Sequence, residues 1–315
     1  MKTKICLIIC WFGKFPNYFE LWEKSCGNNP NIDFFVITNN DYKSKYSNII
    51  AYKFDYKKIN ALLSKKLNLD INIEKPYKFC DFKPVYGIVF SDYIKKYDFW
   101  GHCDMDQIFG DISTFLNDSI LNAYDRVNHL GHFTLYRNTY RINNLYKENG
   151  AKFDYKKVFT SKENFAFDEF SGVNLIFNKN HIKTYEINDF ADIDVKHKRY
   201  LANNLKNYNK QYFEFNNGKL YQVFFERRWK KKPLLYLHFQ KKHPVISIKD
   251  YHSVIRIGKE GITDDFNQLD INRKGNYFSE KFETIRYYNS KVWDFIKSSN
   301  TKKGIWFIQK FGRGK

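Results

Sequence analysis

The chain has 315 residues, enough to bury a core in one large domain or two smaller ones, and its 43% hydrophobic and 19% aromatic content excludes a disordered polypeptide. Its 53 Lys and Arg against 34 Asp and Glu give a net charge of +19, which predicts an anionic partner: nucleic acid, an acidic membrane surface or a phosphorylated small molecule. No apolar run is long enough for a transmembrane helix, and five dispersed cysteines favour free thiols in a reducing cytosol over a disulfide framework.

Strands and helices alternate in the first third of the chain. Short apolar runs predict buried strands at 4–13, 32–39, 49–55 and 98–106. Helical periods predict helices at 15–29, 56–69 and 83–97. The first run is too short for a signal peptide and lacks a small-residue cleavage site, which favours a strand. The alternation predicts an open α/β sheet flanked by helices, in which ligands bind beyond the carboxyl ends of the strands.

The remainder of the chain has a more mixed pattern. Apolar segments predict strands at 129–138, 183–190 and 233–240, and a short helix or turn at 168–179. Two strand-like runs at 211–226 enclose Asn217-Gly218, which predicts a β-hairpin with a type I′ turn. We expect a single main domain over 1–245, followed by a basic C-terminal extension over 246–315.

Asp104 and Asp106 are the first candidates for chemistry, because they stand directly after the apolar run that ends at Cys103. Two carboxylates one residue apart at the mouth of a sheet can share a divalent cation, and oxygen ligands suit Mg²⁺ or Mn²⁺. The alternative is a solvated acidic turn. Asp111 follows in the sequence FGDI, which indicates a turn or a helix cap rather than a metal ligand.

His238 and Lys241 form a second candidate pair, late in the strand LLYLHFQKK. A histidine in a buried strand is often only a core residue, but an imidazole from a distant segment can complete a site begun by two carboxylates. Lys241 and its neighbour Lys242 would meet phosphate oxygens as point charges, or else would simply be solvated.

Three further groups have both a functional and a structural interpretation. Asp168 and Glu169 precede a predicted helix, where one could act as a general base for an acceptor hydroxyl, or both could be helix-dipole acids. Gly172 would allow the backbone to approach closely. Lys83 could reach a diphosphate or lie on the surface. The loop after the first strand carries Trp11 and Phe12, which could stack on a nucleobase or belong to the core.

Two basic, aromatic segments suggest contact with an anionic membrane surface. RRWKKKP places five cations around Trp229, and the C-terminal end places Trp306, Phe307 and Phe311 among Lys and Arg residues. Such segments favour the interface of an anionic bilayer, although a basic run can also be a solvated face.

The segment 75–112 resembles a bacterial family found among capsule and O-antigen biosynthesis genes, and the chain to about residue 243 resembles GT-A-type glycosyltransferases. The features that carry the likeness are the α/β half, the strand ending in Asp-x-Asp and the late His-x-x-Lys. The resemblance implies that Asp104 and Asp106 bind the metal and the donor diphosphate, with His238 as third ligand and Lys83 and Lys241 facing phosphates. Gln240 departs from the pattern, which has a glycine between the histidine and the lysine.

This resemblance implies a metal-dependent glycosyltransferase with a GT-A-like open mixed sheet, Mn²⁺ or Mg²⁺, and a nucleotide-sugar donor, a UDP-sugar. Residues 1–112 would bind the nucleotide sugar and residues 113–245 the acceptor, a hydroxyl of a lipid-linked glycan. The protein would be cytoplasmic and peripheral on the inner face of the cell membrane, held through its basic C-terminal region. The alternatives are a metal-dependent nucleotidyl- or phosphotransferase, and a nucleic-acid-binding protein; the lysine-dominated charge without a zinc-finger pattern disfavours nucleic acid as a partner.

Overall fold

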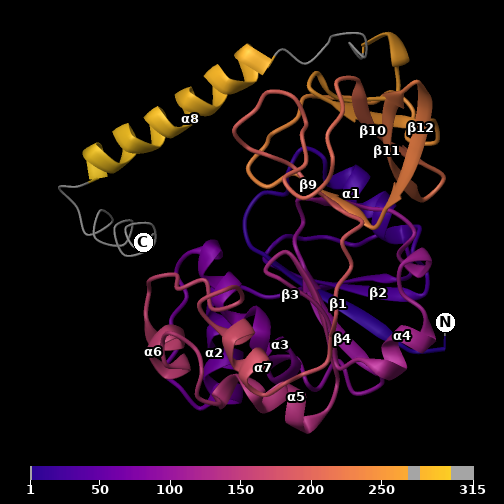
Figure 1. Ribbon diagram of the computed structural model, residues 1–315. Coiled ribbons are helices and arrows are strands. Elements are labelled where there is room, and N and C mark those ends of the chain that lie inside the picture. Colours follow the sequence, from indigo (N-terminus) through magenta and orange to yellow (C-terminus); the bar gives the residue numbers. More distant parts are fainter. Residues whose placement is uncertain (1, 269–276, 299–315) are drawn as a thin grey trace.

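The main structural element is a seven-stranded mixed sheet with the order β3-β2-β1-β4-β7-β6-β8, seen in a computed structural model that describes residues 2–268 and 277–298 (Figure 1). Its strands are β1 (Ile5–Trp11), β2 (Ile32–Thr38), β3 (Ile49–Lys53), β4 (Phe99–Cys103), β6 (Arg126–Leu130), β7 (Phe133–Arg137) and β8 (Thr184–Tyr185). The strands β1 to β4 run parallel, and β7 is antiparallel to both β4 and β6. The predicted open mixed α/β sheet flanked by helices is confirmed.

Two hydrophobic cores cover the two faces of this sheet, because successive strand side chains point to opposite faces. On one face Leu7 packs in a cluster with Trp22 of α1 (Phe19–Gly27). On the other, Ile8 shares a cluster with Leu63 of α2 (Tyr56–Leu67). The helices gathered on this second side in Figure 1 also include α3 (Tyr86–Val89), α5 (Tyr140–Asn144), α6 (Tyr155–Thr160) and α7 (Val173–Lys179). Because hydrophobic clusters cover both faces of the sheet, its strands carry apolar side chains on both sides.

Some predicted elements were wrong in length or number. The helix expected over 83–97 is instead the 3₁₀ helix η1 (Pro76–Val85) followed by the four-residue α3. Pro84 cannot donate a helix hydrogen bond, and a Cβ on Gly87 would lie 2.4 Å from the Trp100 ring, so packing governs this segment. The strand expected over 129–138 is the hairpin β6–β7, and that expected over 183–190 shrinks to β8.

A six-stranded sheet with the order β12-β11-β10-β15-β16-β14 lies beside the main sheet. It consists of β10 (Gln211–Asn216), β11 (Lys219–Glu226), β12 (Arg228–Leu234), β14 (Ile246–Ser247), β15 (Ile255–Gly258) and β16 (Gly261–Thr263). The predicted hairpin is confirmed, with Asn217 and Gly218 at φ values of 48° and 74°. Because β15 pairs with β10, the segment from 246 to 263 shares a sheet with strands before residue 245.

A third sheet of three short strands joins distant parts of the chain. Its order is β5-β13-β9, with β5 (Gln107–Phe109), β9 (Ala191–Asp192) and β13 (Tyr236–His238). His238 pairs with Gln107 on one side and with Asp192 on the other. The register therefore places His238 next to the segment that follows β4.

The remaining helical elements lie at the edges of these sheets. They are η2 (Ile112–Thr114), α4 (Asp118–Ala123), η3 (Leu145–Lys147), η4 (Phe266–Gln268) and α8 (Tyr277–Ser298). Helix α8 stands apart from the sheets in Figure 1. Over residues 2–268 and 277–298, none of the helices combines the length and the apolar character that spanning a bilayer requires.

Candidate metal centre and adjoining cavity

Asp104 and Asp106 lie at the carboxyl end of β4, the strand next to β1 in the middle of the main sheet. Met105 between them is fully buried, which turns the two carboxylates to the same side. The Asp104 amide donates to the His132 carbonyl (3.2 Å) and to Gln107 Oε1 (3.1 Å). The Asp106 carbonyl accepts from the Phe239 amide at 2.8 Å. These bonds fix the backbone that presents the two acids.

The structure brings His238 to both aspartates. His238 Nε2 lies 3.3 Å from Asp106 Oδ1, and one donor atom each from Asp104, Asp106 and His238 lie within 4.8 Å of one another. Asp106 Oδ1 is buried, and its contact with His238 Nε2 is an ion pair that lacks hydrogen-bond geometry. A cation between these groups would give this oxygen a closer partner. Two carboxylate oxygens and an imidazole nitrogen fit Mn²⁺ or Mg²⁺.

Asp192, which the sequence reasoning missed, holds the other nitrogen of His238. Asp192 Oδ1 lies 2.8 Å from His238 Nδ1, so the ring is clamped with Nε2 toward Asp106. Burial alone would lower the pKa of His238, but the Asp106 and Asp192 carboxylates raise that pKa to about 10. A cation binding at Nε2 therefore displaces a proton. Asp192 could have been found from the sequence, because it belongs to a second Asp-x-Asp motif, Asp192-Ile193-Asp194.

Replacing Asp192 by asparagine should weaken Mn²⁺ binding by about 10- to 100-fold, the usual effect of losing an outer-shell carboxylate partner of a metal-bound histidine. Calorimetric Mn²⁺ titration measures this directly. Asp194→Asn is the matched control, because Asp194 contacts Lys196 and His197 rather than His238. Equal Mn²⁺ affinity of Asp192→Asn and the unmodified protein would contradict the role given to Asp192.

A second set of possible ligands, His132, Asp192 and His238, is less suitable for a cation. The rings of His132 and His238 stack with centroids 4.3 Å apart and planes 25° apart. Imidazole lone pairs lie in the ring plane, so those of two nearly parallel rings do not converge on one ion. Burial, followed by the charge of His238, lowers the pKa of His132 to about 3, so this ring is neutral.

Lys83 connects the candidate metal centre to a third carboxylate. Its Nζ lies 2.6 Å from Asp104 Oδ1, 2.7 Å from the Gly131 carbonyl and 3.6 Å from Asp168 Oδ2. Burial alone would lower the pKa of Lys83, but Asp104, the Cys80 thiol and Asp168 together raise it well above its ordinary value. Burial would raise the pKa of Asp104, yet Lys83 and His238 hold that pKa below its ordinary value. Lys83 is thus engaged by acceptors of the protein itself.

Asp168 and Glu169 lie on the turn before α7, against Gly131. Asp168 is 5% exposed, and burial raises its pKa well above the ordinary value, with Lys83 opposing only in part. Glu169 is half-buried, and a Cβ on Gly131 would lie 2.7 Å from its Oε1. The close backbone approach predicted for Gly172 is internal to this turn, since a Cβ there would lie 2.0 Å from the Phe167 carbonyl oxygen. Neither carboxylate lines the cavity described next.

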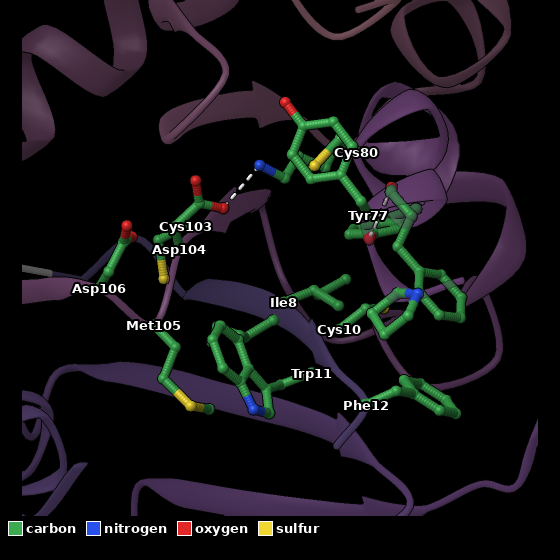
Figure 2. A pocket seen from close by; sticks show the side chains of 15 residues that line it. Ile8, Cys10, Trp11, Phe12, Tyr77, Cys80, Cys103, Asp104, Met105 and Asp106 are labelled. Atoms are coloured by element: carbon green, nitrogen blue, oxygen red, sulfur yellow. Dashed lines mark hydrogen bonds and ion pairs between the residues drawn. The ribbon is translucent and has the colours of Figure 1, made fainter. Parts of the chain in front are cut away.

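A cavity of about 460 Å³ adjoins Asp104 and Asp106. Figure 2 shows the two aspartates on one side, Trp11 below them and Tyr77 across the opening. The wall comes from three segments and includes Ile8, Ile9, Cys10, Trp11, Phe12, Pro76, Tyr77, Phe79, Cys80, Lys83, Tyr86, Cys103, Asp104, Met105 and Asp106. This volume is within the range of small-molecule sites.

The aromatic residues of the cavity differ in how much of each ring a ligand could contact. Phe12 is 4% exposed and stacks on Phe79 at 4.7 Å, so it serves the core. Trp11 is half-buried, with its indole Nε1 donating to the Lys14 carbonyl at 3.1 Å. Tyr77 is 66% exposed and was not singled out from the sequence. Trp11 and Tyr77 are therefore the rings available to a flat ligand.

The segment after His238 places its two lysines differently. Lys241 is exposed, whereas the Lys242 ammonium donates to the His197 carbonyl. Gln240 has φ +55°, a left-handed conformation that glycine adopts at no steric cost. A glycine here, as in the glycosyltransferase pattern, would adopt the same conformation without strain. Trp306, Phe307 and Phe311 lie outside the described residues.

Comparisons with known proteins give a family and distant structural likenesses. A search of curated proteins found no match. Among solved structures, the galactosyltransferase LgtC in complex with donor and acceptor sugar analogues is similar at 12% identity and a TM-score of 0.34, over 60% of this chain and 75% of that chain. The model of the "Family of unknown function (DUF6625)" matches residues 7–265. The chain therefore belongs to the DUF6625 family.

Proposed function

We propose that this protein is a metal-dependent glycosyltransferase that transfers a sugar from a nucleotide-diphosphate sugar, a UDP-sugar, to a hydroxyl of a lipid-linked glycan in surface polysaccharide biosynthesis. The observation that carries the proposal is the convergence of Asp104, Asp106 and His238 beside a cavity of about 460 Å³ at the carboxyl end of β4. In an open α/β sheet this edge is where ligands bind.

The residues of the site divide into a cation-binding group and a nucleotide-binding group. Asp104, Asp106 and His238 would hold Mn²⁺ or Mg²⁺, which when bound neutralises charge on a departing diphosphate. Lys83 keeps Asp104 ionised through their 2.6 Å contact. Trp11 and Tyr77 offer rings in the same cavity on which a uracil base can stack.

Glu169 is the better candidate for a general base if the reaction inverts configuration at the sugar. Its side chain is half-buried, whereas Asp168 is nearly enclosed, and burial raises the pKa of Asp168 although Lys83 opposes this shift. A base must reach the acceptor hydroxyl within hydrogen-bond distance, which favours the exposed member of the pair. Asp168 then acts with Gly131 and Asp104 in fixing the Lys83 ammonium.

A donor screen tests this proposal. The purified protein with Mn²⁺ is incubated with a panel of nucleotide sugars, and the products are separated by chromatography. We expect slow hydrolysis of one UDP-sugar to UDP and free sugar, together with UDP binding that depends on Mn²⁺ in calorimetry. Pyrophosphate release from a nucleoside triphosphate would instead assign the site to a nucleotidyltransferase. Absence of Mn²⁺-dependent nucleotide binding would refute the proposal.

A further inference from the structure

Helix α8 contacts the rest of the protein through polar groups. The carboxylate of Glu280 pairs with the guanidinium of Arg199, and Glu283 Oε2 accepts a hydrogen bond from the Lys198 amide at 3.0 Å. Thr284 Oγ1 lies 3.0 Å from His197 Nε2. The inward face of α8 is thus acidic and hydroxylic, and it meets the short segment 197–199.

Apolar side chains project from another side of the same helix. Phe282 is 68% exposed, Ile285 49% and Tyr288 54%. Residues three apart on an α-helix lie near one another on its surface, so these three form one stripe. Isolated exposed apolar residues are ordinary, but a continuous stripe on a helix marks an interaction surface. We call it the α8 stripe.

The charges of α8 are sorted between the two sides. Its described acids, Glu280 and Glu283, are engaged by the body of the protein. The cations Lys281 and Arg286 are exposed. At about 100° per residue Arg286 borders the α8 stripe next to Phe282, and Lys281 lies within its arc, between Ile285 and Tyr288. The outward side therefore combines apolar and cationic groups, a combination that suits the interface of an anionic bilayer.

We infer that the α8 stripe rests on an anionic lipid surface, with Phe282, Ile285 and Tyr288 inserted at the boundary of headgroups and acyl chains. A second copy of this chain fits the stripe less well, because it would bring two further cations against Lys281 and Arg286. Anionic headgroups instead complement these charges, and the net charge of +19 adds long-range attraction.

The other basic and aromatic surface, strand β12, is less suited to lipid. Trp229 is 43% exposed there, but the neighbouring lysines already have acidic partners on the protein. These pairs are Lys230 with Glu226 (2.8 Å), Lys231 with Glu214, and Lys232 with Asp189 (2.8 Å). Bilayer contact through β12 would have to compete with these pairs, whereas Lys281 and Arg286 are exposed in or beside the α8 stripe.

The position of α8 links this surface to the candidate metal centre. His197, which contacts Thr284 of α8, accepts a hydrogen bond through its carbonyl from Lys242, four residues after His238. A bilayer at the α8 stripe would thus be separated from the chain segment that leaves the metal centre by helix α8 itself, about 10 Å in diameter. The inferred lipid binding does not depend on the proposed function. Only the idea that the acceptor is linked to a lipid of the same bilayer rests on the proposed function.

Vesicle flotation of the full chain tests the inference. The vesicles are phosphatidylcholine alone, or phosphatidylcholine mixed with phosphatidylglycerol. The triple variant Phe282→Ser, Ile285→Ser, Tyr288→Ser is compared with Trp229→Ser and Tyr140→Ser, which alter exposed aromatics elsewhere. We expect salt-sensitive binding to the anionic vesicles alone, reduced about tenfold or more in the triple variant and unchanged in both controls. Circular dichroism and thermal melting verify that each variant is folded.

Three outcomes would overturn the inference. The first is that the unmodified protein does not float with anionic vesicles. The second is that the triple variant floats as well as the unmodified protein. The third is a dimer in light scattering that the triple substitution converts to a monomer, which would mean that a second copy covers the α8 stripe. Nucleotide-sugar hydrolysis in solution, measured in parallel, tests the proposed function separately, because the three substituted side chains lie outside the cavity.

Discussion

Asp106→Asn should abolish measurable Mn²⁺-dependent UDP binding and leave the protein folded. The substitution keeps the size of the side chain but removes one of two anionic ligands. It weakens the ion pair between Asp106 Oδ1 and His238 and breaks no hydrogen bond of that oxygen in the described residues. The affinity for Mn²⁺ should fall by more than the roughly 100-fold upper limit expected for the outer-shell residue Asp192. Titration calorimetry with Mn²⁺ and UDP, together with thermal melting, measures both quantities.

Asp111→Asn is the matched control for this experiment. Asp111 is the N-cap of η2, where its carboxylate accepts from the Ser113 amide (3.0 Å) and from Thr114 Oγ1 (3.1 Å). Asparagine caps helices nearly as well, so both stability and Mn²⁺ binding should persist. Mn²⁺-dependent UDP binding by Asp106→Asn at the unmodified affinity would show that the two aspartates do not form the metal centre.

Asp81→Ala should cost about 3–5 kcal/mol of the free energy of unfolding, a large share of the stability of an ordinary domain. Asp81 is fully buried and pairs with the equally buried Lys78 at 2.8 Å. It also accepts from the amides of Phe165 and Phe167. Alanine would leave a buried ammonium without its counter-charge and two amides without an acceptor. Urea unfolding followed by circular dichroism measures the loss.

The comparison variant is Asp92→Ala, which breaks another lysine–aspartate pair. Lys66 and Asp92 lie 2.7 Å apart, but the Asp92 side chain is 63% exposed, so its loss should cost no more than about 1 kcal/mol. If both variants lose a similar amount of the free energy of unfolding, the buried pair of Asp81 and Lys78 does not stabilise the fold more than an exposed pair does. Because Asp81 holds the segment that leads to Asp168 and Glu169, Asp81→Ala should also lower transfer activity in the protein that remains folded.

The sequence was sufficient to predict the main sheet because its strands are buried on both faces. The runs at β1, β2 and β4 are apolar throughout, and this pattern does not depend on distant contacts. The same reasoning placed Asp104 and Asp106 at the edge of the sheet, where they lie. The hairpin at Asn217-Gly218 was predictable because it rests on local backbone preferences.

The parts that could not be predicted depend on contacts between distant segments. The segment 83–97 has a helical period, but Gly87 packs against Trp100. Just before it, the Lys78–Asp81 pair binds backbone groups around residues 158–167. Asp192 belongs to a two-residue strand that exists only through pairing with β13. Phe12 and Trp11 are adjacent in sequence and both line the cavity. Only the packing shows that Phe12 is buried against Phe79 whereas Trp11 is half-buried.

The three-stranded sheet β5-β13-β9 has a consequence for insertions and deletions. His238 reaches Asp106 and Asp192 because β13 pairs in one register, and only Leu235 separates β13 from β12. A slip by one residue turns every side chain of a strand to the opposite face. One residue added or removed beside Leu235 would present Leu237 or Phe239 to the aspartates, so a chain can keep every ligand in its sequence and still lose the metal centre.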